Sequence, residues 1–205
     1  KLDGKQAGTF GTAAMFSFCQ TKVFTTGEGG CIVTDSEDIC QKIKLLRSHG
    51  RNENYEYVGL GYNFRMADSL AALGISQINK VDKLISERRQ KAEYFKKALA
   101  GIEEITLPEY PENLFHVFQE YAIRAKEGKE VRDKLKDYLA KKGIGTRVSF
   151  LPIHLSRFYK EKKGEIRLEK TEKIASSALT LPLYPDLSEE EIDYIASEIK
   201  NFYAG

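Results

Sequence analysis

The stretch that decides the fold reads Phe16-Ser17-Phe18-Cys19-Gln20-Thr21-Lys22, followed two residues later by Thr25-Thr26-Gly27-Glu28-Gly29-Gly30. The apolar run over residues 13–18 predicts a buried strand, and residues 30–34 predict a second strand. Lys22 therefore lies in the connection between two strands, near the strand-end hydroxyl of Ser17. A lysine held at such a junction can form a Schiff base with a carbonyl group. An ordinary surface lysine is the alternative, and spacing alone favours it.

Composition excludes several classes of protein. The chain has 205 residues, of which 41% are hydrophobic and 30% charged, with a net charge of +2. These values are typical of a soluble globular protein with one large core or two small ones. Basic and acidic residues are interleaved, and no apolar run approaches the roughly 20 residues that span a bilayer. We expect a cytoplasmic protein that binds neither nucleic acid nor membrane.

The cysteines and histidines do not predict a metal site. Three cysteines and three histidines are present, and they share no short spacing of the kind that ligates zinc. Cys19, Cys31 and Cys40 are interpreted as small hydrophobic residues in a reducing compartment.

The remaining patterns alternate between helical and extended. A helix capped by Asp35 or Ser36 should end near residue 48, before a glycine-rich loop over residues 50–62. Later elements are strands at 117–125 and 145–150, and helices at 66–99, 130–142, 169–179 and 188–203. Ser188 and Glu191 match a capping box. The order predicts an α/β portion followed by a smaller α+β portion.

Three further motifs each allow a structural and a functional interpretation. The glycines of residues 27–30 fit a tight turn better than a phosphate-binding loop, because no Gly-Lys-Ser/Thr ending follows them. Asn63 and Arg65 precede the long helix, where they could bind an anion. The simpler roles are an N-cap or turn residue for Asn63 and a surface ion-pair partner for Arg65. His154 follows a strand in an apolar segment, and a lone histidine there is more often structural than catalytic.

Taken together, the motifs resemble the DegT/StrS family of sugar aminotransferases, which have the aspartate-aminotransferase fold (fold type I). The resemblance covers nearly the whole chain in the family's order. The matching segments are residues 4–11, 16–30, 47–51, 61–66 with 71–74, 152–154 and 181–185.

The resemblance implies a pyridoxal 5'-phosphate (PLP) cofactor and a role for four residues. Lys22 would form the Schiff base and then act as the base for proton transfer, and Ser17 would bind the cofactor phosphate. Asn63 matches an asparagine that reaches the phosphate in the neighbouring subunit of a homodimer. His154 would lie near the nucleotide-sugar site. One branch of the family has histidine at the lysine position and catalyses dehydration, and Lys22 argues against that branch.

The resemblance also implies a fold and an activity. Residues 1–88 would be the C-terminal portion of the PLP-binding large domain, and residues 89–205 a small α+β domain. The family's acidic partner of the pyridine nitrogen belongs to a Glu-Asp-x-Ala-type motif upstream of Lys1, so we expect a C-terminal fragment of the enzyme. The expected reaction transfers an amino group from glutamate to a nucleotide-linked keto-sugar. The alternative is a non-catalytic regulatory or interaction module that keeps the fold.

Overall fold

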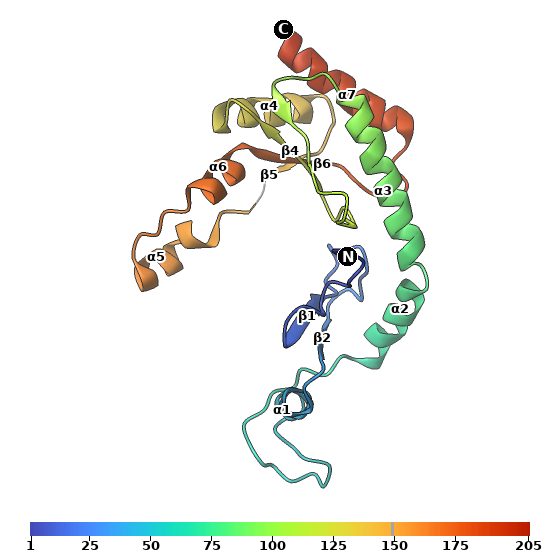
Figure 1. Ribbon diagram of the computed structural model, residues 1–205, viewed down its shortest axis with the longest axis vertical. Helices are drawn as coiled ribbons and strands as arrows, with labels where there is room; N and C mark the ends of the chain where they lie inside the picture. The colour runs from blue at the N-terminus through green and yellow to red at the C-terminus, as the bar shows by residue number, and fades with distance from the viewer. Residues whose placement is uncertain (149) are drawn as a thin grey trace. The chain divides into compact units, whose positions relative to one another are not determined.

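The computed structural model describes residues 1–148 and 150–205 (Figure 1). The chain forms two compact units. The first contains Lys1–Ile85 and Pro111–His116, and the second contains Ser86–Tyr110 and Val117–Gly205. No helix in the described part of the chain is long and apolar enough to cross a membrane.

The first unit is built around an antiparallel pair of strands, β1 (Ala13–Ser17) and β2 (Gly30–Thr34). Both strands were predicted, and their register pairs Ser17 with Gly30. The prediction that the first strand is buried is wrong: four of its five residues are exposed, and Met15 is 80% exposed. A strand is buried by layers packed on its faces, and this sheet has two strands only.

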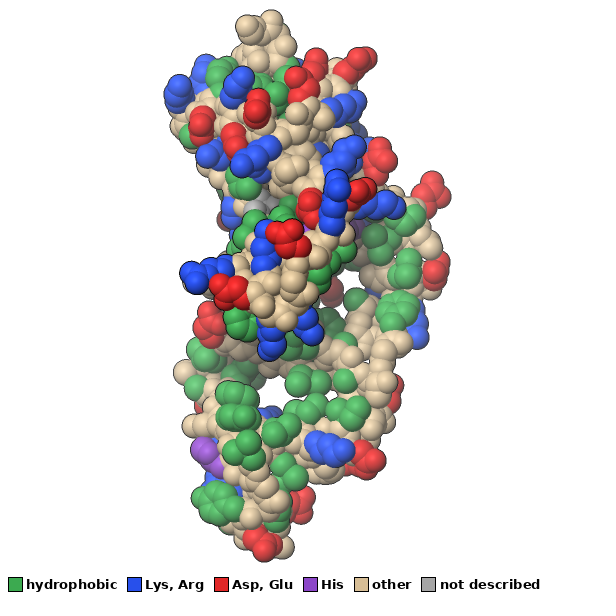
Figure 2. Space-filling view, turned by 90° about the vertical axis from the view of Figure 1, so that its left-hand side faces the viewer, with side chains coloured by type: hydrophobic (Ala, Val, Ile, Leu, Met, Phe, Trp, Pro, Cys, Tyr) green, Lys and Arg blue, Asp and Glu red, His purple; other side chains and the backbone are tan. Residues whose placement is uncertain are grey.

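Hydrophobic side chains are unusually open on the first unit. Figure 2 shows them in green over the lower part of the view, with few charged groups between them. The exposed large hydrophobic residues of this unit include Phe10, Met15, Tyr55, Tyr57, Leu60, Phe64 and Ile75.

Helix α1 (Glu37–Arg47) follows β2 as predicted, with Ser36 as its N-cap. The Ser36 hydroxyl accepts a hydrogen bond from the Ile39 backbone N–H at 3.4 Å. Gly50 ends the turn after the helix with φ +69°, and a Cβ there would overlap the Gly59 carbonyl oxygen. Only glycine allows this close crossing of the two ends of the loop.

The single helix predicted over residues 66–99 is wrong, because two helices occupy that range. They are α2 (Asp68–Ile78) and α3 (Val81–Ala98), separated by Asn79 and Lys80. The Lys80 N–H donates to the Gln77 carbonyl at 3.0 Å, which is the i−3 bond of a tightened last turn. Asparagine has a low helix propensity, but the apolar periodicity continues across the break and hides it.

The second unit contains a four-stranded antiparallel sheet. Its strands, in the order β3-β4-β6-β5, are Ile105–Thr106, Tyr121–Ala125, Ala178–Leu181 and Arg147–Val148. The strands predicted at 117–125 and 145–150 are present but shorter, and Ser149 lies outside the described residues. β6 was not predicted. All four of its residues are buried, so it shows no alternation of polar and apolar positions.

Helices α4 (Lys129–Lys141), α6 (Glu169–Ser177) and α7 (Glu189–Ala204) confirm the three that were predicted in this unit. The capping box at Ser188 and Glu191 is also present. A short helix, α5 (Arg157–Lys163), and the 3-10 turn η1 (Ile153–Leu155) were not predicted.

The main hydrophobic core belongs to the second unit. The Phe95 and Tyr121 rings stack with centroids 5.0 Å apart, joining α3 to β4. Burial raises the pKa of the Tyr121 hydroxyl. Other fully buried members are Leu99, Ile123, Leu135, Leu139, Leu179, Leu181, Ile192 and Ile199.

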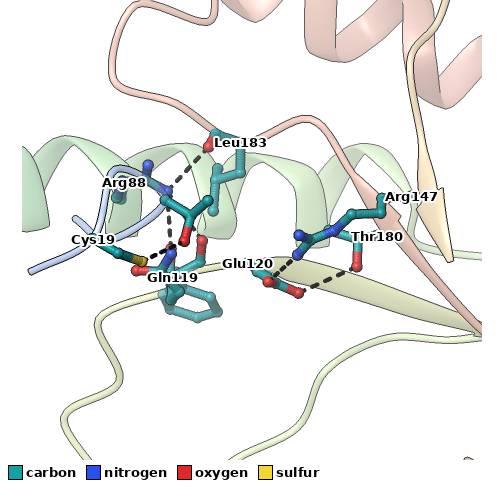
Figure 3. A network of polar contacts seen from close by, with 9 residues as sticks. Cys19, Arg88, Gln119, Glu120, Arg147, Thr180 and Leu183 are labelled. Carbon is teal, nitrogen blue, oxygen red and sulfur yellow. Dashed lines mark hydrogen bonds and ion pairs between the residues drawn. The ribbon is translucent and has the colours of Figure 1, made fainter. Parts of the chain in front are cut away.

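Two arginines connect segments of this unit through polar contacts (Figure 3). The Arg88 Nη1 group of α3 donates to the carbonyl oxygens of Phe118, Gln119 and Leu183 at 3.2, 3.4 and 3.0 Å. Arg147 of β5 forms an ion pair with Glu120, whose other carboxylate oxygen accepts from the Thr180 hydroxyl of β6 at 3.4 Å.

Candidate active site

The connection between β1 and β2 is a closed loop. The Phe18 N–H donates to the Gly29 carbonyl at 2.8 Å, and the Thr26 N–H donates to the Phe18 carbonyl at 3.0 Å. A parallel bridge joins Cys19 to Gly27. Residues 19–27 therefore form a loop that leaves the end of β1 and returns to it, with Lys22 inside the loop.

Two threonines hold this loop closed. The Thr25 hydroxyl donates to the Phe18 carbonyl at 3.0 Å and accepts from the Gly27 N–H at 2.9 Å. Thr26 is 1% exposed, and its hydroxyl donates to the Glu28 carbonyl at 2.7 Å. The sequence analysis did not assign either residue, although a pair of threonines directly before a glycine-rich turn is a visible signal for local side-chain hydrogen bonding.

The glycines after the threonines form the tight turn that was predicted. Gly27 and Gly29 both have positive φ, +83° and +152°. A Cβ at Gly29 would lie 2.6 Å from the Thr26 hydroxyl oxygen, so a side chain there would disrupt the closed loop.

Lys22 is exposed, and its backbone N–H donates to the Cys19 carbonyl at 3.0 Å. Its amine forms no hydrogen bond or ion pair with any residue in the described ranges. The fixed backbone and the unengaged amine leave the side chain available for a reaction partner.

Ser17 is the last residue of β1 and is also exposed. Its oxygen accepts from the Cys19 N–H at 3.4 Å, so the hydroxyl hydrogen remains available for an anion. The Cys19 sulfur lies 3.2 Å from the Thr21 hydroxyl oxygen, and this hydrogen bond lowers the pKa of the thiol. The end of β1 and the loop after it thus carry a hydroxyl donor and a primary amine five residues apart in the sequence.

Asn63 lies on a different segment of the first unit, in an antiparallel bridge with Ser48 at the end of α1. It is exposed and does not cap α2, whose N-cap is Ala67. Arg65 donates from Nη1 to the Ser48 hydroxyl at 3.3 Å rather than to a carboxylate. The cap and ion-pair alternatives for Asn63 and Arg65 are therefore wrong, and the exposed Asn63 amide is available for a binding role.

His154 belongs to η1 in the second unit, and only 9% of its side chain is exposed. Its Nε2 lies 3.1 Å from a Glu172 carboxylate oxygen that also accepts from the Leu168 N–H at 2.8 Å. The hydrogen bond from Leu168, followed by that from His154, lowers the pKa of Glu172. His154 thus has a structural partner on α6, and its role in substrate binding stays a prediction.

Ser17 ends β1, Lys22 lies in the closed loop that follows it, and Asn63 lies on another segment of the same unit. In the described ranges, no group of three or more His, Cys, Asp and Glu side chains is arranged to hold a metal ion. The site therefore offers an amine nucleophile with neutral hydrogen-bond donors, which is a donor set for a phosphorylated carbonyl compound.

Two curated proteins are similar in sequence to nearly the whole chain. The chain is 35% identical over 210 residues to "Pleiotropic regulatory protein" of Geobacillus stearothermophilus, with 99% of this chain and 55% of that protein aligned. It is 32% identical over 206 residues to GDP-perosamine synthase of Escherichia coli O157:H7, covering 100% of this chain and 55% of that protein.

A solved structure has a fold similar to that of this chain. Helicobacter pylori PseC, an aminotransferase involved in the biosynthesis of pseudoaminic acid, superposes with a TM-score of 0.91 at 26% identity, over 100% of this chain and 56% of that one. The chain spans about half the length of the curated relatives it matches. A sequence profile of the DegT/DnrJ/EryC1/StrS aminotransferase family matches residues 1–200. The chain therefore belongs to the DegT/DnrJ/EryC1/StrS aminotransferase family.

Proposed function

We propose that the full-length protein is a PLP-dependent aminotransferase that moves an amino group from glutamate to a nucleotide-linked keto-sugar. The observation on which this rests is the closed loop at the end of β1, which fixes the backbone of Lys22 and leaves its side chain exposed, five residues after the exposed Ser17. Membership of the family supports the same chemistry.

The residues present fit the cofactor. The Lys22 amine suits a covalent bond to an aldehyde carbon, the Ser17 hydroxyl suits a phosphate oxygen, and the Asn63 amide adds a further donor. When bound, PLP supplies an electron sink that makes the Cα proton of an amino acid labile. Lys22 Nζ would take that proton and deliver it again during the transfer, acting as general base and then general acid. The two threonine contacts would keep the Lys22 backbone in place during both steps.

The domain arrangement and the assembly are part of the proposal. Residues 1–88 would complete the PLP-binding large domain, and residues 89–205 would form the small domain. Two compact units support this division. The protein would act as a homodimer in the cytoplasm, with Asn63 serving the neighbouring active site.

The substrate class is inferred from the relatives. GDP-perosamine synthase carries a nucleotide in its name, and PseC is an aminotransferase involved in the biosynthesis of pseudoaminic acid. We therefore place the reaction in cell-surface polysaccharide or amino-sugar biosynthesis, and we keep His154 as a residue near the sugar.

A non-catalytic regulatory or interaction module is the second candidate, because one relative is named a pleiotropic regulatory protein. The presence of Lys22 in the closed loop and of Ser17 at the end of β1 argues against it. A full-length protein that stays colourless after incubation with PLP would favour the module, and a visible absorption band from bound cofactor would favour the enzyme.

Mixed dimers test the shared site. Full-length Lys22→Ala and Asn63→Ala variants should each be impaired as homodimers, since each lacks one contribution to both sites. A verified heterodimer would contain one site with both residues intact, so part of the aminotransferase activity should return. Heterodimers with no recovery would refute the shared-site arrangement.

A further inference from the structure

We propose that Gly74 of α2 is a positioning residue for Lys22 and that it acts through Thr26. The inference rests on the proposed function, in which Lys22 is the reacting residue. Gly74 is buried in the middle of α2, and Thr26 is buried in the closed loop that holds Lys22. Both residues belong to the first unit.

The backbone of α2 gives no reason for a glycine at position 74. Gly74 lies inside a regular α-helix, where any residue except proline fits and where glycine is less stable than alanine. The reason is the space beside it. A Cβ at position 74 would lie 2.9 Å from the Thr26 Cγ2 methyl and 3.8 Å from the Phe24 ring. Carbon atoms in ordinary contact are about 3.5–4.0 Å apart, so a side chain at position 74 would push on Thr26.

Thr26 cannot simply turn its methyl group away. The methyl and the hydroxyl are both attached to Cβ, so rotation about χ1 moves them together. The hydroxyl is fixed by its bond to the Glu28 carbonyl at 2.7 Å, and the backbone N–H by its bond to the Phe18 carbonyl at 3.0 Å. A push on the methyl therefore moves the whole residue, because close-packed interiors transmit strain.

Thr26 is connected to Lys22 through the closure of the loop. The Thr26 N–H bond and the bridge between Cys19 and Gly27 bring the end of the loop back to β1. Lys22 lies between these points, and its own N–H donates to the Cys19 carbonyl. A displacement of Thr26 therefore shifts the backbone from which the Lys22 side chain extends.

Aromatic side chains extend the contact between the loop and α2. The Phe18 and Phe24 rings meet edge to face, with centroids 4.8 Å apart. Both rings line an apolar pocket together with Thr26, Met66 and Gly74. Helix α2 is thus the support for this side of the loop, and Gly74 sets how closely the two approach.

A pair of substitutions in the full-length protein tests the proposal. Gly74→Ala adds the Cβ that overlaps the Thr26 methyl by roughly 0.6 Å. A misplacement of about 1 Å can cost about 100-fold in rate, so we expect a loss of about tenfold, in kcat rather than in KM. Thr26→Ser removes the methyl and keeps the hydroxyl. The Gly74→Ala/Thr26→Ser double variant should therefore regain the kcat of Thr26→Ser alone.

The recovery separates positioning from general destabilisation. Thr26→Ser deletes a buried methyl group, so it should add to any loss of stability instead of reversing it. Ser76→Ala is the matched control, because it also raises the helix propensity of α2 but lies at an exposed position. The control should have the kcat of the unmodified protein.

Hydrogen exchange of the cofactor-free protein gives a readout that does not depend on activity. The Phe18 and Thr26 amides close the loop, so they should exchange about tenfold faster in Gly74→Ala and return toward the unmodified rate in the double variant. Thr26→Val approaches the same link from the loop. It keeps a methyl group against Gly74 and removes the bond to Glu28, so it should also speed exchange and lower kcat, even if Gly74→Ala fails to fold.

Three results would overturn the proposal: unchanged kcat and exchange in Gly74→Ala, a double variant no better than Gly74→Ala, or an equal loss in Ser76→Ala. Failure of the proposed function is a separate result. It would appear as an unmodified full-length protein in which PLP and borohydride label no lysine. The exchange rates of the cofactor-free variants would still decide whether Gly74 sets the position of the loop.

Discussion

Arg88 provides the sharpest test of how the second unit is held together. Replacing it with Met keeps an unbranched apolar stem of similar reach and removes the guanidinium. The carbonyl oxygens of Phe118, Gln119 and Leu183 then lose their shared donor. The segment before β4 and the segment after β6 should therefore separate from α3 more easily.

The magnitude follows from the geometry. Nη1 has two hydrogens, so three acceptors at 3.0, 3.2 and 3.4 Å share two donors. Two charge-assisted hydrogen bonds give a gross stabilisation of about 3–6 kcal/mol. Burial lowers the pKa of Arg88, which shows that its charge also loses hydration, so part of the gain is cancelled. We expect a net loss of about 2 kcal/mol.

Native-state hydrogen exchange of the full-length protein measures this loss locally. Amides in β4 and β6 that exchange by unfolding of the second unit should exchange about 30-fold faster in Arg88→Met. This factor corresponds to about 2 kcal/mol. Arg157→Met is the control, because the Arg157 side chain is 91% exposed and its ion pair is with Glu161 on its own helix. Equal exchange in the Arg88 variant and the unmodified protein would refute the reasoning.

Two further predictions concern the last helix. Glu198 accepts from the Tyr138 hydroxyl at 2.7 Å and pairs with Lys142 at 3.1 Å, and these contacts lower its pKa below the ordinary 4.5. The stabilisation from Glu198 is complete above that value and is lost as the pH falls through its lowered folded-state pKa. The free energy of unfolding of Glu198→Gln should therefore change less with pH over this acid range than that of the unmodified protein. The same pH dependence in both proteins would contradict this. Ser188→Ala removes the cap that bonds the Glu191 N–H at 3.1 Å and should weaken protection of the first turn of α7 by about 1 kcal/mol, whereas unchanged exchange would count against the capping role.

Local signals in the sequence predicted the elements whose stability is local. Ser36 and Ser188 cap the helices that they were expected to cap, because the hydroxyl and its N–H partner lie within three residues. The two strands around Lys22 were also predicted from local signals, because each is a short apolar run and they are adjacent strands in the chain. The break between α2 and α3 was missed because Asn79 and Lys80 interrupt the helix without interrupting its apolar pattern.

Features that depend on distant contacts were not predictable. β6 lies inside the sheet, between β4 and β5, and all four of its residues are buried. Because its sequence has no alternation of polar and apolar residues, it could not be distinguished from the end of the preceding helix. The pairing of His154 with Glu172 joins residues 18 positions apart on separate elements.

The identity of the lysine that binds PLP tests the central claim most directly. The full-length protein would be incubated with PLP, reduced with borohydride, digested and analysed by mass spectrometry. The account predicts a phosphopyridoxyl group on Lys22 and on no other lysine, and no labelled peptide from Lys22→Ala. Stoichiometric labelling of a different lysine, or none in a folded full-length protein, would contradict it.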